Sequence, residues 1–247
     1  MIILVTNDDG VFAEGIRHLA EALAPLGDIW IVAPDRERSA ASHALTLDSP
    51  LRIQEVDQHR YAVNGTPTDC VNVGVLHILK DRKPDLIVSG INFGLNIGDD
   101  VTYSGTVSAA FEGTILGIPS LAVSQEVGSP MPYERSAAFI REFIESLMQR
   151  DLLKNGLLLN INLPFEDPIG VRFTRLGKRQ YSEGVMEKVD PRGKKYYWIG
   201  GIPRPTEIEE GTDFHALTHR HISITPLHLD LTDYTALDRM KDLSFKD

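Results

Sequence analysis

Two adjacent carboxylates, Asp8 and Asp9, follow the first apolar run of the chain and stand before Gly10. Neighbouring side chains of a strand point to opposite faces, so both can reach one ion only if the backbone turns, which Gly10 permits. Adjacent carboxylates repel each other, and a site that brings them together needs a cation. Oxygen ligands suit Mg²⁺, Mn²⁺ or Ca²⁺ better than zinc. Alternatively, Asp8 caps the next helix and Asp9 is solvated, because Asp-Gly turns are common.

A second polar segment, residues 34–43, follows the next apolar run. Ser39 could supply a neutral oxygen ligand, Arg36 or Arg38 could meet an anionic substrate, and His43 could transfer protons. Serine and arginine in loops are more often turn formers or solvated side chains, and one unpaired histidine says little by itself.

A third segment, residues 89–100, carries three glycines and two asparagines beyond another apolar run. Asn92 and Asn96 offer carbonyl oxygens to a metal and amide donors to a phosphate. The glycine spacing fits neither the dinucleotide-binding fingerprint nor the Walker A loop, and no Gly-Lys-Ser/Thr follows. The alternative is a plain turn.

Residues 103–107 then open a helix. Free N–H groups and the helix dipole at such a start bind anions, and the hydroxyls of Ser104 and Thr106 add donors. An ordinary Ser/Thr N-cap is the simpler interpretation. The functional interpretation depends on convergence, since an oxygen-rich metal site and a phosphate cradle would lie on one edge of one sheet.

Several other kinds of site find no support in the sequence. It contains no His-Glu-x-x-His and no pair of cysteines for zinc. It contains no Gly-x-Ser-x-Gly nucleophile elbow, which argues against a serine hydrolase. The segment Asn7-Asp8-Asp9 also differs from the Asp-x-Asp pattern of phosphatases that form an aspartyl-phosphate.

Composition indicates an ordinary globular protein of 247 residues, 42% hydrophobic and 24% charged. The net charge of −10 argues against a general nucleic-acid-binding surface, although a bound divalent cation can invert the potential of an acidic pocket. No apolar run approaches the roughly 20 residues of a membrane-spanning helix. With no basic leader and a single cysteine, Cys70, we expect a mature cytoplasmic protein that acts away from membranes.

Strand and helix patterns alternate through the first part of the chain and predict the elements that position these residues. The fold class is therefore α/β, with a mainly parallel sheet covered by helices on both faces. Ligands bind beyond the carboxyl ends of the strands in such sheets, which is where the polar segments stand. The expected strands are 2–6, 28–33, 85–89, 120–124, 157–162 and 221–226, and the expected helices are 14–26, 67–79, 106–116 and 134–150.

The pattern changes after about Leu163. Residues 164–168 form a breaker cluster, and 171–205 are rich in Gly, Lys, Arg and Tyr without a helical period. We expect one domain over residues 1–247, in which about 164–205 form an appendage of extended hairpins that project from the core.

Taken together in their order along the chain, five segments resemble the SurE family of survival-protein nucleotidases. Each segment is modest alone, and the ordered set is very specific; the resemblance extends more weakly beyond Leu163. The segments are residues 3–10, 32–34 with 38–39, 64–71, 84–92 with 94–96, and 103–110.

The resemblance implies a Rossmann-like fold and one divalent metal ion per subunit, Mg²⁺ or Mn²⁺. The metal ligands of the family fall on Asp8, Asp9, Ser39 and Asn92. The phosphate-binding positions fall on Asn96, Ser104, Gly105 and Thr106. The resemblance further implies hydrolysis of nucleoside 5′- and 3′-monophosphates, with short polyphosphate as another possible substrate, and a homodimer or homotetramer formed through the C-terminal extension.

The mechanism expected from these residues is attack by water in line with the scissile P–O bond, with Asp8 or Asp9 orienting the water. A carboxylate that binds a metal is a weak base, so the proton-transfer role stays open. Two other classes remain as alternatives. One is a protein that binds a nucleotide or a metal without turnover, and the other is an oligomer whose acidic loops bind Ca²⁺.

Overall fold

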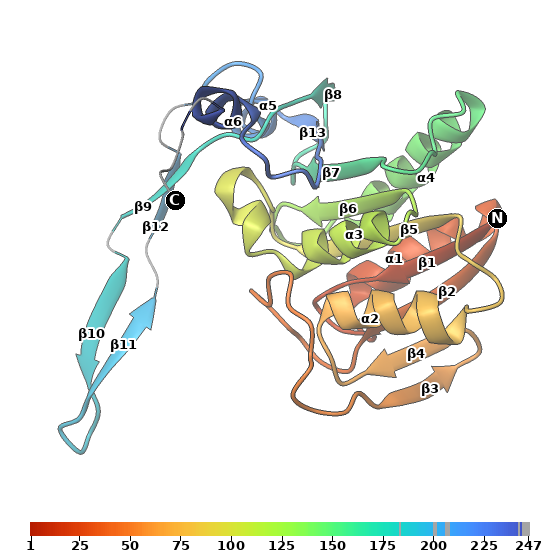
Figure 1. Ribbon diagram of the computed structural model, residues 1–247, viewed down its shortest axis with the longest axis horizontal. Coiled ribbons are helices and arrows are strands. Elements are labelled where there is room, and N and C mark those ends of the chain that lie inside the picture. The colour runs from red at the N-terminus through yellow and green to blue at the C-terminus, as the bar shows by residue number, and fades with distance from the viewer. Residues whose placement is uncertain (183, 200–201, 206–207, 242, 244–247) are drawn as a thin grey trace.

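Figure 1 shows a computed structural model of the chain, which describes residues 1–182, 184–199, 202–205, 208–241 and 243. In this described part, nine strands form one twisted sheet. Their order across the sheet is β3 (Ile53–Asp57), β4 (Arg60–Val63), β2 (Asp28–Pro34), β1 (Ile2–Thr6), β5 (Leu86–Phe93), β6 (Ser120–Gln125), β7 (Leu158–Leu163), β13 (His221–Pro226) and β8 (Gly170–Phe173).

The middle of the sheet is parallel, from β4 through β2, β1, β5 and β6 to β7. Only the outer strand β3 and the strand β13 run antiparallel to a neighbour, β4 and β7 respectively. Parallel strands are buried on both faces, which explains why β1 and β5 read as nearly continuous apolar runs. The carboxyl ends of β1, β5 and β6 therefore meet at one edge of the sheet.

Helices cover both faces of the sheet, as predicted (Figure 1). On one face α1 (Glu14–Leu23) packs against α4 (Tyr133–Gln149), and on the other α2 (Pro67–Val73) packs against α3 (Gly105–Ile115). Alternation along β1 serves both layers: Ile3 and Val5 belong to the cluster of α1 and α4, and Leu4 to that of α2 and α3. Across the described residues, every helix is too short or too polar to cross a bilayer.

The start of α2 shows how local sequence sets an element. Thr66 Oγ1 accepts a hydrogen bond from Asp69 N at 3.1 Å, and Asp69 Oδ2 accepts one from Thr66 N at 2.8 Å. Pro67 occupies the first turn, where its missing N–H costs nothing. The helix then continues through a π-helical turn over Gly74–Ile78, so the predicted extent to about residue 79 is confirmed.

Two differences from the predicted elements stand out, and the second affects the site. The hairpin of β3 and β4 has no predicted counterpart, because β3 lies at the sheet edge with most side chains exposed and lacks the alternation of a half-buried strand. Strand β5 runs four residues beyond the predicted end at Ser89, as far as Phe93. Asn92 therefore lies in the last part of a strand rather than in a loop.

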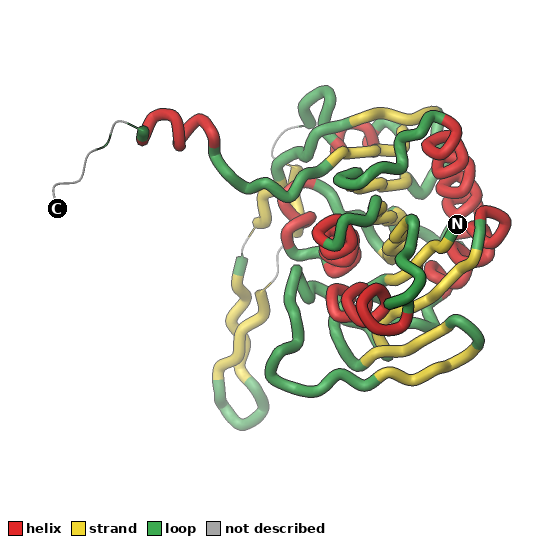
Figure 2. The backbone as a smooth tube through the Cα atoms, turned by 45° about the vertical axis from the view of Figure 1, so that its right-hand side comes forward, coloured by secondary structure: helices red, strands yellow, loops and turns green. Residues whose placement is uncertain are grey.

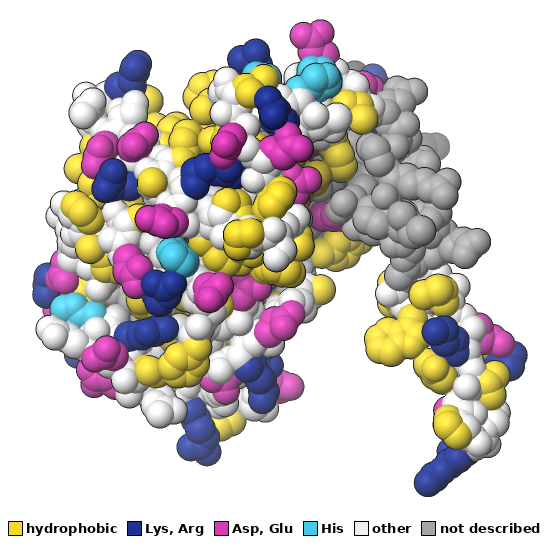
Figure 3. Space-filling model, turned by 180° about the vertical axis from the view of Figure 1, so that it is seen from behind, with side chains coloured by type: hydrophobic (Ala, Val, Ile, Leu, Met, Phe, Trp, Pro, Cys, Tyr) yellow, Lys and Arg dark blue, Asp and Glu magenta, His cyan; other side chains and the backbone are white. Residues whose placement is uncertain are grey.

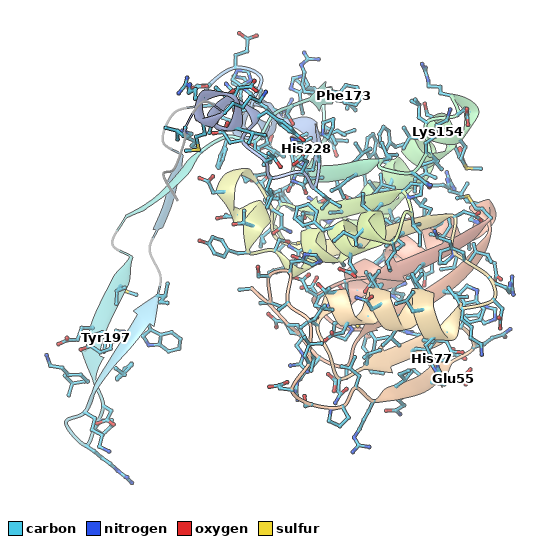
Figure 4. All side chains as sticks on the ribbon, viewed as in Figure 1. Glu55, His77, Lys154, Phe173, Tyr197 and His228 are labelled. Atoms are coloured by element: carbon cyan, nitrogen blue, oxygen red, sulfur yellow. The ribbon has the colours of Figure 1, made fainter. Side chains whose placement is uncertain are left out.

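The C-terminal part confirms an extended hairpin region, although β8 joins the main sheet. Beyond it, β9 (Arg179–Ser182) pairs with β12 (Ile202–Pro205), and β10 (Val185–Val189) pairs with β11 (Lys195–Ile199), both antiparallel. We call these four strands the arm. The arm projects far from the sheet, and Tyr197 near its end lies away from the body (Figures 1 and 4).

Two short helices complete the described chain. Helix α5 (Asp213–Thr218) packs against β13, next to the root of the arm. Helix α6 (Tyr234–Met240) buries none of its residues and stands apart from the body (Figure 2).

Candidate functional site

The turn after β1 brings Asp8 and Asp9 to the sheet edge. Asn7, fully buried, closes the turn by donating from Nδ2 to Gly10 O at 2.9 Å and accepting from Gly10 N through Oδ1 at 3.2 Å. Gly10 has a φ of +106°, a conformation that side chains strongly disfavour. The turn predicted from Asp-Gly therefore forms, and it presents both carboxylates at the end of one buried strand.

The two carboxylates are held by different neighbours. Asp8 is 7% exposed, and Thr106 Oγ1 at the start of α3 donates to its Oδ1. Asp9 is half-buried, and its Oδ2 accepts from Phe93 N at the end of β5 at 3.2 Å. Asp8 is thus hydrogen-bonded to helix α3, and Asp9 to the neighbouring strand β5.

Both carboxylates are electrostatically unfavourable as they stand. Burial raises the pKa of Asp8, although hydrogen bonds from Thr106 oppose the shift. Burial and the nearby charge of Asp8 raise the pKa of Asp9 to about 6, with a smaller contribution from Glu37. Burial and like charge both disfavour the ionised carboxylates, and a cation between these groups would oppose the rise of both pKa values.

A break in the pairing of β5 with β6 turns Asn92 to the same place. The register shifts between Ser89 and Asn92, as in a β-bulge that re-aims a side chain. At Gly90, φ is +139° and an added Cβ would lie 2.3 Å from Val123 O, so only glycine fits. The Nδ2 of Asn92 donates to Gly94 O at 2.8 Å, which leaves its Oδ1 as the atom able to bind a cation.

The start of α3 approaches Asp8 from the other side. Ser104 is the N-cap, and its Oγ accepts from Val107 N at 3.1 Å. An added Cβ at Gly105 would lie 3.0 Å from Asp8 Cβ and 3.1 Å from Asp8 Oδ2. Glycine at this position therefore keeps the helix N-terminus, with its partial positive charge, close to the carboxylate pair.

Asn96 is clamped by polar side chains of the neighbouring strands. Its backbone N donates to Asn162 Oδ1 at 2.8 Å, and its backbone O accepts from Asn160 Nδ2 at 2.8 Å and from Asn162 Nδ2 at 3.0 Å. Its side-chain Nδ2 donates to Ser124 Oγ at 2.8 Å. These bonds fix the segment after β5 in a single position.

Ser39 reaches the site from the segment after β2. Arg38 N donates to Asp8 O at 2.8 Å, which ties this segment to the turn after β1. The hydroxyl of Ser39 donates to Glu37 Oε1 at 2.5 Å. Glu37 thus adds a third acidic side chain, next to Ser39.

These residues surround a cavity of about 880 Å³ at the carboxyl edge of the sheet. The structure brings six of the eight predicted site residues to the cavity wall. The whole wall carries four carboxylates, and no lysine, arginine or histidine is among the described residues that line it. Ile199 of the arm and Gly184, the residue before β10, also border it. The predicted residues on the wall are Asp8, Asp9, Ser39, Asn92, Asn96 and Ser104.

The donor set fits a hard divalent cation. No described cluster of three or more His, Cys, Asp or Glu side chains is arranged to hold a metal, so the candidate ligands are of mixed type. Two carboxylates, a hydroxyl and an amide carbonyl match the oxygen ligands that Mg²⁺ and Mn²⁺ take. A phosphate dianion would be repelled from this acidic wall unless a cation were bound there.

Gly105 and Thr106 stand just behind the wall. Thr106 is fully buried, and its hydroxyl is engaged by Asp8, so it orients that carboxylate. His43, a candidate for proton transfer, lies outside the cavity lining and is paired with Glu112 at 2.8 Å. Arg36 and Arg38 are also absent from the described lining.

Several wall residues were not expected from the sequence. Glu37 and Asp100 add charge, and the exposed rings of Phe93 and Tyr103 form part of the wall. Glu37 stands two residues before Ser39, which is a signal that sequence reasoning could have used. The contribution of Ile199 has no local signal, because only the path of the arm brings it there.

The comparisons with known proteins point to one family. Residues 3–183 match the family model described as survival protein SurE. The chain is 54% identical over 245 residues to a protein from Pelobacter propionicus named 5'-nucleotidase SurE, with coverage of 96% of this chain and 97% of that protein. It is 52% identical over 250 residues to the protein of the same name from Geobacter sulfurreducens, with coverage of 99% and 95%.

A solved structure is similar throughout. The crystal structure of the SurE protein from Aquifex aeolicus superposes with a TM-score of 0.87 at 43% sequence identity, and the match covers 98% of each chain. The likeness therefore extends past the first half of the chain into the C-terminal region.

Proposed function

The chain belongs to the SurE family, and we propose that it is a metal-dependent 5'-nucleotidase that hydrolyses nucleoside monophosphates to nucleoside and phosphate. The observation that carries the proposal is the acidic cavity in which Asp8 and Asp9 stand beside the N-terminus of α3. The names of the relatives from Pelobacter propionicus and Geobacter sulfurreducens, both 5'-nucleotidases, support the same reaction.

In this proposal Asp8, Asp9, Ser39 and Asn92 hold one Mg²⁺ or Mn²⁺ ion. The cation would act as a Lewis acid that neutralises the charge of the phosphoryl group. The hydrogen bond from Thr106 holds Asp8 in a fixed orientation. Asp9, which is closer to solvent, orients the attacking water in line with the scissile P–O bond.

The phosphate is proposed to lie against the start of α3. The first N–H groups of a helix lack intrahelical partners and carry the positive end of the dipole, which suits the backbone at Gly105 and Thr106 to an anion, although the Thr106 N–H also donates to Asp8. Ser104 adds a hydroxyl, and Asn96 adds a side-chain amide, both at the cavity wall. Such fixed donors stabilise charge that develops on the phosphoryl oxygens.

Two exposed rings favour a nucleotide over a smaller phosphate ester. Phe93 is 54% exposed and Tyr103 is 63% exposed, and both belong to the cavity wall. Aromatic rings stack on bases of any sequence, at about 1–3 kcal/mol for each base. The base would then lie over these rings while the phosphate faces Asp8 and Asp9.

The wider parts of the proposal concern substrate range and assembly. We include 3′-monophosphates and short polyphosphate among the substrates, and a homodimer or homotetramer formed through the C-terminal arm. The arm exposes Tyr197, Trp198 and Ile199, and a second subunit would cover them. We keep residues 1–247 as one domain with about 164–205 as its appendage, and the cytoplasm as the compartment, where the free Cys70 stays reduced.

The deciding experiment is phosphate release from nucleoside 5′- and 3′-monophosphates, from tripolyphosphate, and from ribose 5-phosphate as a control without a base. Each assay is run with Mg²⁺, with Mn²⁺ and with EDTA. We expect metal-dependent release that EDTA abolishes, with a lower kcat/KM for ribose 5-phosphate. Tight nucleotide binding without release from well-folded protein would instead support a binding protein, and a thermal shift with Ca²⁺ alone would support a structural oligomer.

A further inference from the structure

The segment that carries Ser39 is attached to the helix layer by contacts that the proposed chemistry does not use. We call residues 39–46 the Ser39 loop. Just before its middle, Ser42 N donates to Tyr103 O at 3.1 Å, and Ser42 Oγ donates to Thr102 O at 2.9 Å. Two residues further on, Ala44 O accepts a hydrogen bond from Thr66 Oγ1 at 2.8 Å.

The middle of the Ser39 loop is held by a hydrogen-bond contact between His43 and Glu112. His43 Nε2 lies 2.8 Å from Glu112 Oε2, on α3, and the ring of His43 stands edge-on to Phe111 at 6.1 Å between centroids. The other oxygen of this carboxylate, Oε1, accepts from Asn72 Nδ2 of α2 at 2.8 Å. His43 thus joins the loop to two helices through one carboxylate.

Glu112 is an unusual residue for its place. Its side chain is only 10% exposed, and a nearly buried carboxylate is costly unless its oxygens are paired. The other buried residues of α3 in this stretch, Ala109, Ala110 and Gly113, are small and uncharged. An apolar residue would fill position 112 without this cost, so the charge points to a task other than packing.

The loop itself needs to be held. Ala40 and Ser42 both have a φ of 54°, in the left-handed region that residues with a Cβ disfavour. Such conformations persist where surrounding contacts determine them. Ser39 adjoins Ala40, so relaxation of the backbone at residue 40 would move the Ser39 hydroxyl.

We propose that His43 and Glu112 are positioning residues that hold the Ser39 loop so that the Ser39 hydroxyl stands at the cavity wall. His43 does not line the cavity, so it acts through the loop rather than on the substrate. The inference rests on the proposed metal site, of which Ser39 is one of two neutral ligands. Residues that orient a metal ligand commonly change metal affinity by about 10- to 100-fold when they are replaced.

The test measures binding of Mn²⁺ alone to the full chain, with free Mn²⁺ counted by electron paramagnetic resonance. His43→Phe keeps the ring beside Phe111 and removes the N–H, and Glu112→Gln keeps the volume and removes the charge. We expect each variant to bind Mn²⁺ about tenfold more weakly than the wild type. The kcat at saturating Mn²⁺ should stay within about threefold, because neither residue touches the reacting atoms.

His59→Phe is the matched control. His59 Nδ1 lies 3.4 Å from Asp28 Oδ1, and its ring stacks on Trp30 at 3.7 Å, so the substitution again keeps a ring and removes a contact between a histidine and a carboxylate. Asp28 begins β2, at the opposite edge of the sheet from the cavity. We expect His59→Phe to bind Mn²⁺ as the wild type does.

A double variant sharpens the test. If the two side chains act through their contact, His43→Phe combined with Glu112→Gln should weaken Mn²⁺ binding no more than either change alone. Additive losses would contradict a shared action. Thermal unfolding without metal should be close to the wild type for both single variants, which separates positioning of Ser39 from a general loss of structure.

Other outcomes would overturn the inference. Unchanged Mn²⁺ affinity in both variants would show that the pair does not position Ser39, and a matching fall in unfolding temperature would show a purely structural role. A large fall in kcat at saturating Mn²⁺ with unchanged affinity would assign proton transfer to His43. If the wild type itself failed to bind Mn²⁺, the proposed metal site would be wrong. That result differs from equal Mn²⁺ binding by the wild type and the variants, which would contradict only the positioning role.

Discussion

The turn after β1 and the arm differ most in the kind of side chain that each buries or exposes. Asp8 is 7% exposed and is held by bonds to Thr106 and to the segment after β2. On the arm, Trp198 is 59% exposed and Ile199 is 91% exposed, and the space-filling view shows the apolar side chains of β10 and β11 in the open (Figure 3). Charge is buried in one region and apolar surface is exposed in the other.

Both arrangements are unfavourable for the chain by itself. Burial raises the pKa of Asp8 and of Asp9 because it disfavours the ionised form. An exposed apolar patch stays in contact with water unless another molecule covers it. In the proposals above, the partner that the single chain lacks is a cation at the turn and a second subunit at the arm, and each can be tested separately.

The largest effect should come from Asp9→Asn. We expect nucleotidase activity to fall at least about a hundredfold, because the change removes a proposed metal ligand and a group that orients water. The metal-free fold should survive, since the amide is isosteric and removes an unfavourable charge. The measurement is phosphate release beside circular dichroism of the same sample. Unchanged turnover would remove Asp9 from the site.

The next effect is a pH dependence of stability in EDTA. The pKa of Asp9 in the folded chain is about 6, raised from 3.8, so the folded state favours the protonated form. Its contribution to stability is therefore full below pH 3.8 and is lost as pH rises to about 6. Relative to Asp9→Asn, the wild type should lose about 2 kcal/mol over this range.

Urea unfolding at several pH values, as wild type minus variant, checks this dependence. Saturating Mn²⁺ should remove the loss, because the cation favours the ionised form. A difference that stays constant between pH 4 and pH 6 in EDTA would show that Asp9 carries no unfavourable charge in the folded chain.

A smaller effect should follow from Gly105→Ala. The new Cβ would lie about 3.0 Å from Asp8 Cβ and would displace that carboxylate. We expect activity to fall about tenfold, while the free energy of unfolding changes by less than about 1 kcal/mol. Gly170→Ala is the matched control, because its nearest neighbour, His221 Cδ2, would stand at an ordinary 3.4 Å. Equal activity of the two variants would contradict the close approach of α3.

The smallest effect on turnover should come from the arm. Tyr197→Ser with Trp198→Ser removes exposed rings, so the free energy of unfolding of the single subunit should change by no more than about 0.5 kcal/mol for each change. Light scattering should nevertheless show a shift from oligomer to monomer. Leu76→Ser, at an exposed residue of the helix layer, is the control that should leave the assembly intact.

The sequence predicted much of the site because the relevant signals are local. Asp8 and Asp9 precede a glycine that turns the chain, and Thr66, Pro67 and Asp69 mark a helix start through bonds within three residues. Such features depend on neighbours along the chain. The parallel sheet then followed from the alternation of strands with helices, and it placed Asn92 and Ser39 at the same edge.

Other features could not be predicted in this way. The edge strand β3 and the short helix α5 lack a strong apolar period, so tertiary contacts decide them. Asn92 was expected in a loop, but the register shift in β5 keeps it in the strand. His43 was considered for proton transfer, and its actual neighbour, Glu112, is 69 residues away.

By itself, then, the sequence determined the kinds of chemical group available and the strand ends at which they stand, because turns and caps are stabilised by nearby residues. Only the tertiary structure decided which of these groups meet. Thr106 reaches Asp8 across 98 residues, and the rings of Phe93 and Tyr103 share a wall with residues of the arm. These contacts depend on strand order, register and helix packing, which are set by the burial of the whole apolar core rather than by any local pattern.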